Sequence, residues 1–192
     1  MRAPNHYLDH MIEVLKEVGD AFRRGHSVLG VANEFLEWAD YSDIELTPMQ
    51  LQKLCYLAHG FSLALLGKPL VKDPVEAWDW GPVFPQLYDA VKRYGSGPVV
   101  GPIRENNWAS YDHVRGEHVT ANLSPDERGL MAKVLKTYGK FQGFQLSALT
   151  HEAGSPWEQV YVPGKRSIRI PDSLIKQYFD KVVTGGNVGQ HG

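Results

Sequence analysis

The chain has 192 residues, 43% of them hydrophobic, so it can bury one substantial core and is expected to form a single domain. Its formal net charge of -2 gives no global attraction for DNA or RNA, and its single cysteine, Cys55, excludes an intramolecular disulfide framework and a zinc site built from several cysteines. No stretch reaches the roughly 20 apolar residues of a membrane span, and the N-terminal region shows no continuous apolar signal-peptide core. We therefore expect a cytoplasmic protein with no membrane partner.

Residues 7–24 are predicted to form an amphipathic helix. The apolar side chains on its expected face recur at steps of three and four residues: Leu8, Met11, Ile12, Leu15, Val18 and Phe22. Arg23 and Arg24 followed by Gly25 fit the C-terminal end of this helix, because basic side chains suit the negative pole of the helix dipole and glycine adopts the left-handed stop conformation. Ser27 is a suitable N-cap for a second helix.

The segment 46–99 holds the densest pattern of helix starts, stops and turns in the chain. Residues 47–50, Thr-Pro-Met-Gln, form a capping-box helix start. The apolar stripe over 51–65 then predicts a central, buried helix that ends at Gly67.

Trp78 and Trp80 lie one residue apart, which in an extended segment places both side chains on a common face. We predict that Gly81-Pro82 ends this segment and that both indoles pack against the central helix. The alternative is that the indoles are anchors of a protein interface. Pro85 then opens the next helix, and Gly95 stops it.

Gly, Pro and Asn dominate 95–122, where short strands are predicted at 99–103 and 111–120, the second with a hairpin turn at 115–117. Further helices are predicted at 124–139, at 145–152, from 155–157 onward and from 171 to 182. The expected fold class is mainly α (α+β): a single compact helical domain of six or seven helices with a small extended or β-hairpin element.

Groups that could perform chemistry are few. Cys55 and His59 lie four residues apart on one helix face, which suggests a nucleophile or metal site, but Cys55 falls within the apolar stripe and is predicted to be a core residue. His59 is predicted to satisfy a buried polar partner. The other histidines show no metal-ligand spacing, and residues 95–98 lack the Gly-Lys-Ser/Thr ending of a phosphate loop. The chain is therefore not expected to be an enzyme, and no catalytic residue, metal ligand or cofactor is assigned.

Candidate partner-binding residues lie on the apolar face of the 7–24 helix, in the two indoles and in a small basic cluster: Leu8, Ile12, Leu15, Phe22, Trp78, Trp80, Lys165 and Arg166. The 7–24 helix is expected to expose apolar surface that docks on the body of the protein, on a second copy or on another protein. A homo-oligomer is therefore one of the alternatives left open.

Several motifs, taken in order, resemble the SocA-like antitoxin domain, which is also called Panacea and has been associated with GepA-type phage proteins. They lie at 46–60, 67–70, 76–83, 85 and 88, 94–97, 149–152 and 156–157. The resemblance runs from about Val28 to Phe179. It divides the chain into an N-terminal amphipathic extension at 1–26, a Panacea/SocA-like domain at 27–183 and a tail at 184–192, which is expected to be flexible.

The resemblance implies an antitoxin of a bacterial or phage toxin–antitoxin system that neutralises a cognate protein toxin by direct binding. It also implies a proteolytic adaptor role in which the toxin is delivered to the ClpXP protease. One alternative is a DNA-binding autoregulator of its own operon, although the near-neutral charge and the lack of an obvious helix-turn-helix argue against a nucleic-acid partner. A Cys-dependent hydrolase built on Cys55 is the other alternative.

Overall fold

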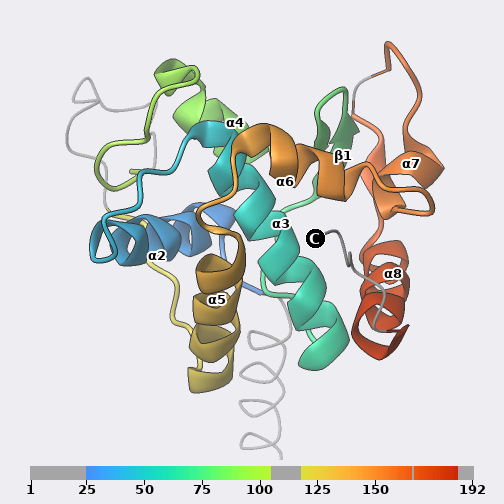
Figure 1. Ribbon diagram of the computed structural model, residues 1–192, viewed down its shortest axis with the longest axis horizontal. Helices are drawn as coiled ribbons and strands as arrows, with labels where there is room; N and C mark the ends of the chain where they lie inside the picture. The colour runs from blue at the N-terminus through green and yellow to red at the C-terminus, as the bar shows by residue number, and fades with distance from the viewer. Residues whose placement is uncertain (1–24, 105–117, 166, 186–192) are drawn as a thin grey trace, which may run out of the picture.

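A computed structural model of the protein describes residues 25–104, 118–165 and 167–185. These ranges contain a small antiparallel sheet and seven α-helices: α2 (Val28–Asp40), α3 (Pro48–Leu65), α4 (Pro85–Val91), α5 (Pro125–Tyr138), α6 (Gly143–Thr150), α7 (Pro156–Val160) and α8 (Asp172–Gly185). α3 runs through the centre, with α2 and α5 on one side and α8 on the other (Figure 1). The predicted fold class, a mainly helical domain with a small extended element, is confirmed.

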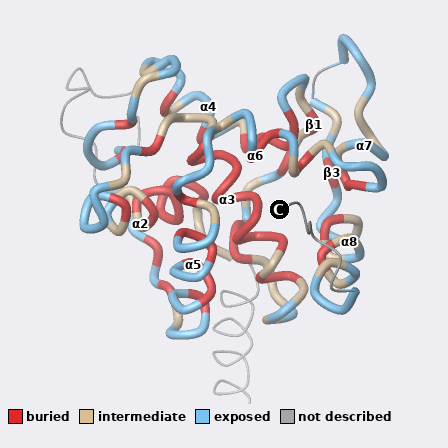
Figure 2. Tube along the Cα trace, in the orientation of Figure 1, coloured by how far each residue is buried: buried red, intermediate tan, exposed pale blue. Residues whose placement is uncertain are grey.

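α3 begins at the predicted capping box. The backbone N–H of Gln50 donates to Oγ1 of Thr47 at 3.4 Å, and the N–H of Thr47 donates to Oε1 of Gln50 at 3.0 Å. The helix is buried along most of its length, as expected for the central element of the core (Figure 2). Leu65 departs from the predicted buried stripe, because it lies in the last turn and is 56% exposed.

α8 packs closely on α3 because Gly60 has no side chain. The ring of Phe179 lies over Gly60, where a Cβ atom would clash with it. The same ring makes edge-to-face contacts with Phe61 at 4.9 Å and with Tyr56 at 6.0 Å between ring centroids. The bare backbone at Gly60 therefore sets how closely these two helices approach.

The sheet has the order β2-β1-β3 and joins distant parts of the chain. β1 (Val75–Trp78) pairs antiparallel with β2 (Gly81–Val83) and, on its other edge, with β3 (Arg169–Ile170). The prediction that Gly81-Pro82 ends the extended segment is wrong, because these residues begin the second strand. Pro82 is tolerated there because β2 is an edge strand.

The strand predicted at 99–103 is not formed, because an asparagine from α2 takes the place of a partner strand. The side chain of Asn33 accepts from the N–H of Ile103 at 2.7 Å and donates to its carbonyl at 2.8 Å, while the N–H of Val99 donates to the carbonyl of Leu46 at 2.8 Å. Most of the strand predicted at 111–120, including its turn at 115–117, lies outside the described residues.

Candidate protein-binding site

Trp80 lies in the two-residue turn between β1 and β2, and its side chain is 71% exposed. The prediction that it packs against the central helix is wrong. The physical reason is that β1 ends at Trp78, so that Asp79 and Trp80 reverse the chain and do not continue the extended face. Trp78 is half-buried and makes an edge-to-face contact with Tyr88 of α4, with ring centroids 4.9 Å apart.

A buried lysine holds the backbone of this turn from inside the protein. Lys53 of α3 is 1% exposed, and its Nζ donates to the carbonyl of Trp80 at 2.6 Å and to that of Pro82 at 3.1 Å. The hydroxyl of Ser147 on α6 donates to the same Trp80 carbonyl at 3.1 Å. Gly81 makes room for this arrangement, with a φ of +100° and with Nζ of Lys53 only 2.5 Å from where a Cβ would lie.

The residues of α7 and the residue that follows it hold the other side of the turn. The indole of Trp157 donates to the carbonyl of Trp78 at 2.7 Å, and the hydroxyl of Tyr161 donates to Oδ1 of Asp79 at 2.9 Å. The rings of Trp157 and Tyr161 stack, with centroids 4.4 Å apart. The turn is thus fixed from both sides while the Trp80 side chain stays in solvent, which lowers the entropy cost of using it to bind a partner.

A second large apolar side chain is exposed on α6, the helix that supplies Ser147. Phe144 lies one helical turn before Ser147 and is 72% exposed. We call Trp80, Phe144 and the partly exposed Tyr88 the turn surface, because each lies on the turn or on an element that contacts the hairpin. Isolated exposed apolar residues are common on proteins, but an exposed tryptophan on a fixed turn is typical of protein-binding sites.

Comparison with known proteins identifies the family. The model of the SocA-like antitoxin, Panacea domain family matches residues 51–158. Antitoxin SocA of Caulobacter vibrioides (strain NA1000 / CB15N) is 35% identical over 156 residues, which cover 78% of this chain and 80% of that protein. This chain belongs to the SocA-like antitoxin family. No solved structure matches it.

The family assignment confirms the resemblance inferred from the motifs, and the fold brings several of these motifs together at the β1–β2 hairpin. The motif at 46–60 supplies Lys53, the motif at 76–83 supplies the turn, and those at 149–152 and 156–157 supply His151 and Trp157. His151 meets Trp157 edge-to-face at 3.9 Å between centroids. Burial, with the nearby charge of Lys53 as a smaller cause, lowers the pKa of His151. Motifs far apart in the sequence therefore converge on one hairpin.

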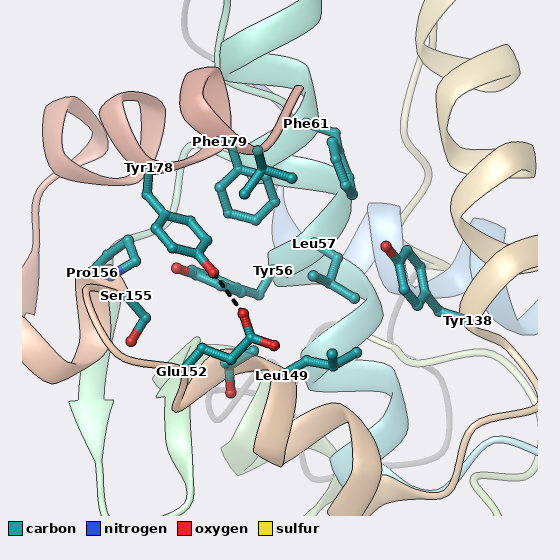
Figure 3. Close-up of a pocket in the computed structure, with 12 residues that line it drawn as sticks. Tyr56, Leu57, Phe61, Tyr138, Leu149, Glu152, Ser155, Pro156, Tyr178 and Phe179 are labelled. Atoms are coloured by element: carbon teal, nitrogen blue, oxygen red, sulfur yellow. Dashed lines mark hydrogen bonds between the residues drawn. The ribbon is translucent and has the colours of Figure 1, made fainter. Parts of the chain in front are cut away.

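A narrow cleft lined by tyrosines opens between α3, α8 and the connection from α6 to α7 of the Panacea domain (Figure 3). The hydroxyl of Tyr178 donates to Oε2 of Glu152 at 3.3 Å, and burial, together with the charge of Glu152, raises the pKa of Tyr178 to about 12. The cavity volume of about 40 Å³ is close to what one water molecule occupies. The cleft therefore has no room for a small-molecule substrate in this conformation.

Cys55 and His59 do not form a reactive pair. Cys55 is fully buried, and burial raises the pKa of its thiol, which disfavours the thiolate that a nucleophile requires. Nδ1 of His59 accepts from the N–H of Val71 at 3.2 Å, and its Nε2 lies 3.1 Å from Oδ1 of Asp172. Both predictions, a core cysteine and a histidine that satisfies polar partners, are confirmed. Across the described ranges, no group of three His, Cys, Asp or Glu side chains is placed to hold a metal ion.

The other candidate partner-binding residues of this SocA-like protein stay predictions. The four apolar residues of the 7–24 segment and Arg166 lie outside the described residues, and Lys165 is exposed on the loop after α7. Sequence reasoning missed Lys53, Phe144 and Ser147. The position of Lys53 within the apolar segment of the central helix could have indicated its burial.

Lys53→Met is expected to remove a pH dependence of stability. Burial lowers the pKa of Lys53 to about 7, whereas an unfolded chain keeps it near 10.4, so the penalty for burying the charged form is complete below pH 7 and is relieved as the pH rises. Between pH 7 and 9.5 the free energy of unfolding should rise by up to about 3 kcal/mol in the wild type relative to the variant. Urea unfolding of both proteins across this range measures the difference, and parallel pH profiles would contradict it.

No helix within the parts of the chain that the structure describes is long and apolar enough to span a bilayer.

Proposed function

We propose that this chain is the antitoxin of a toxin–antitoxin pair, that it neutralises a cognate protein toxin by direct binding, and that the turn surface lies in the interface. The family assignment and the name of the Caulobacter relative support the general role. We place the interface at this surface because of Trp80. Its side chain is 71% exposed, while its backbone carbonyl accepts a hydrogen bond from the fully buried Lys53. Large aromatics presented on a rigid backbone are the side chains that most often dominate binding energy.

The proposed role is not enzymatic. The buried, protonated thiol of Cys55 and the small volume of the tyrosine cleft both argue against a hydrolase. No observation favours the DNA-binding alternative, because the formal net charge is -2 and the sequence has no obvious helix-turn-helix. We place the protein in the cytoplasm, where its toxin would act.

The direct test is co-expression with the product of the neighbouring gene. The toxin expressed alone should stop growth, co-expression should restore it, and a tag on either protein should recover a stoichiometric complex. Growth arrest that persists despite equal expression of both proteins, with no complex recovered, would overturn the proposal.

We also propose that the chain delivers the toxin to ClpXP, and a separate measurement tests this role. If the chain is a proteolytic adaptor, the half-life of the toxin should shorten when the antitoxin is present and should lengthen again in cells without ClpX. If neutralisation is steric alone, the toxin stays stable in the complex in both strains.

Removal of residues 1–24 tests whether the N-terminal extension contributes to toxin binding. The candidate residues in this extension are Leu8, Ile12, Leu15 and Phe22. We expect the truncated chain to keep the fold, because the chain is anchored again at His26, and to bind the toxin at least tenfold more weakly. Circular dichroism checks the fold and titration calorimetry measures affinity. Undiminished toxin binding by the truncated chain would refute this role.

A further inference from the structure

α3 and α5 lie side by side (Figure 1). A groove lies between the end of α3 and α5. Its volume is about 490 Å³, and its apolar lining comes from the end of α3 and from α5: Phe61, Leu65, Leu66, Pro125, Leu130 and Val134. Gly129 adds a stretch of bare backbone, since a Cβ there would meet nothing within 4 Å. An apolar groove with a glycine in its wall is shaped to receive another helix.

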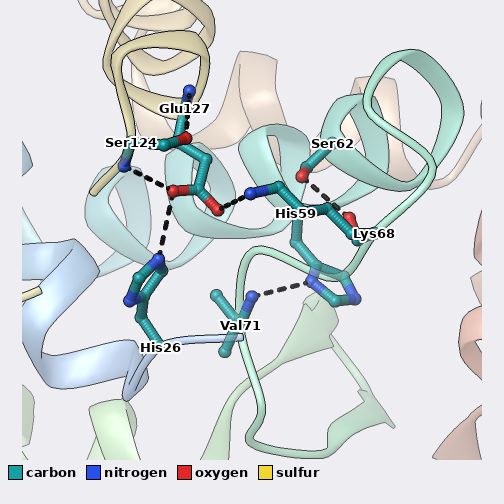
Figure 4. Close-up of polar contacts among 7 residues, drawn as sticks. All are labelled: His26, His59, Ser62, Lys68, Val71, Ser124 and Glu127. Carbon is teal, nitrogen blue, oxygen red and sulfur yellow. Dashed lines mark hydrogen bonds and ion pairs between the residues drawn. The ribbon is translucent and has the colours of Figure 1, made fainter. Parts of the chain in front are cut away.

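The described chain starts at one end of this groove. The N–H of His26 donates to the carbonyl of Leu70 at 2.7 Å, and Nε2 of His26 lies 3.3 Å from Oε2 of Glu127 in the first turn of α5 (Figure 4). Glu127 also accepts from Nζ of Lys68 at 2.8 Å and from the N–H of Ser124 at 2.7 Å. These contacts fix the point where the preceding segment joins the body, next to Pro125 and Asp126 of the groove.

The hydrogen bonds to Glu127 are strong because its carboxylate is ionised. Burial alone would raise its pKa, but the hydrogen bonds from Lys68, Ser124 and His26 outweigh burial and hold the pKa at about 2. Glu127 therefore stays ionised throughout the neutral and mildly acidic range.

The 24 residues before this join match the groove in length and pattern. The predicted helical face from Tyr7 to Phe22 spans 16 residues, or about 24 Å, and the 14 residues of α5 span about 21 Å. Length, apolar pattern and point of attachment all agree.

We propose that residues 7–22 of the same chain dock into the α3–α5 groove as an amphipathic helix antiparallel to α5. Leu8, Ile12, Leu15 and Phe22 then position the segment in the free protein, while its polar face is presented to solvent. The inference concerns the free protein and does not depend on the identity of the toxin.

Hydrogen exchange measured by mass spectrometry on the full chain tests the proposal. An isolated helix of this length is marginal in water, so slow exchange in 7–22 requires docking. Gly129→Trp fills the groove from an exposed position without touching the core, and Leu15→Glu disrupts the docking face from the other side. Both should speed exchange in 7–22 at least tenfold and leave α3 protected, whereas Tyr41→Ala, at an exposed aromatic on another part of the surface, should change nothing.

Equal, fast exchange of 7–22 in the wild type and in both groove variants would overturn the proposal. Protection that grows with protein concentration, together with a dimer mass in light scattering, would also overturn it and would place the segment on a second copy. Unchanged protection in Gly129→Trp, with Leu15→Glu still releasing the segment, would mean that it docks elsewhere on the body.

Discussion

Trp80→Ala is expected to weaken binding of the cognate toxin by about 2–4 kcal/mol, or about 30- to 1,000-fold in Kd. The indole is exposed in the free protein, so its removal leaves the core intact and should change the free energy of unfolding by less than about 0.5 kcal/mol. The backbone of the turn is held by Lys53 and Ser147 through the carbonyl group of Trp80, which alanine retains. The variant therefore separates the side chain from the scaffold that presents it.

Tyr41 supplies the matched control for this experiment. It is 81% exposed and caps the C-terminal end of α2. α2 lies on the side of the molecule away from the hairpin (Figure 1). Tyr41→Ala should bind the toxin like the wild type, while Phe144→Ala should show a loss smaller than that of Trp80→Ala. Titration calorimetry with the purified toxin measures all three. Wild-type affinity in Trp80→Ala would remove the turn surface from the interface and leave the antitoxin role to another face.

Gly60→Ala is expected to destabilise the protein by about 1–3 kcal/mol, although alanine is the better helix former. The new methyl group would enter space filled by the ring of Phe179, and that ring cannot swing aside because Tyr56, Phe61 and Tyr178 contact it. The clash would force α8 away from α3. Thermal unfolding should show a melting temperature lower by several degrees.

Gly129→Ala is the control that isolates the clash. Gly129 also lies inside a helix, but a Cβ there meets no atom of the described residues. In chains without residues 1–24, where the groove is empty, alanine should therefore stabilise the protein by about 0.5–1 kcal/mol. The two variants carry the same chemical change and should move stability in opposite directions. If Gly60→Ala were as stable as Gly129→Ala, the close approach of α8 to α3 would be wrong.

Local patterns predicted the helix starts well, because each depends on residues only two or three positions apart. The box at Thr47 and the cap at Ser27 form as predicted, and the helix predicted from residue 124 begins with a second box at Ser124. The outcome at 99–103 differs because the decisive partner, Asn33, comes from a helix distant in sequence, and no short-range pattern reveals it.

The sequence motifs of the candidate site could be predicted, but the positions of its side chains in space could not. The aromatic pair at Trp78 and Trp80 was found in the sequence, but a two-residue turn sends the second indole to solvent, and this depends on where β1 ends. Lys53 was missed because a lysine on a helix is ordinarily solvated, and only the carbonyl groups of Trp80 and Pro82 make its burial tolerable.

The supports of the Trp80 turn have a consequence for how the protein is made. Apart from Lys53, they lie later in the chain than the turn itself: Ser147, Trp157, Tyr161 and finally β3, whose Ile170 pairs with Val75. During synthesis on the ribosome the hairpin emerges long before the residues that brace it. A prematurely terminated chain that lacks the segment after residue 146 would display the tryptophan on a turn held only by Lys53. The rigid form therefore requires translation through Ile170 at least.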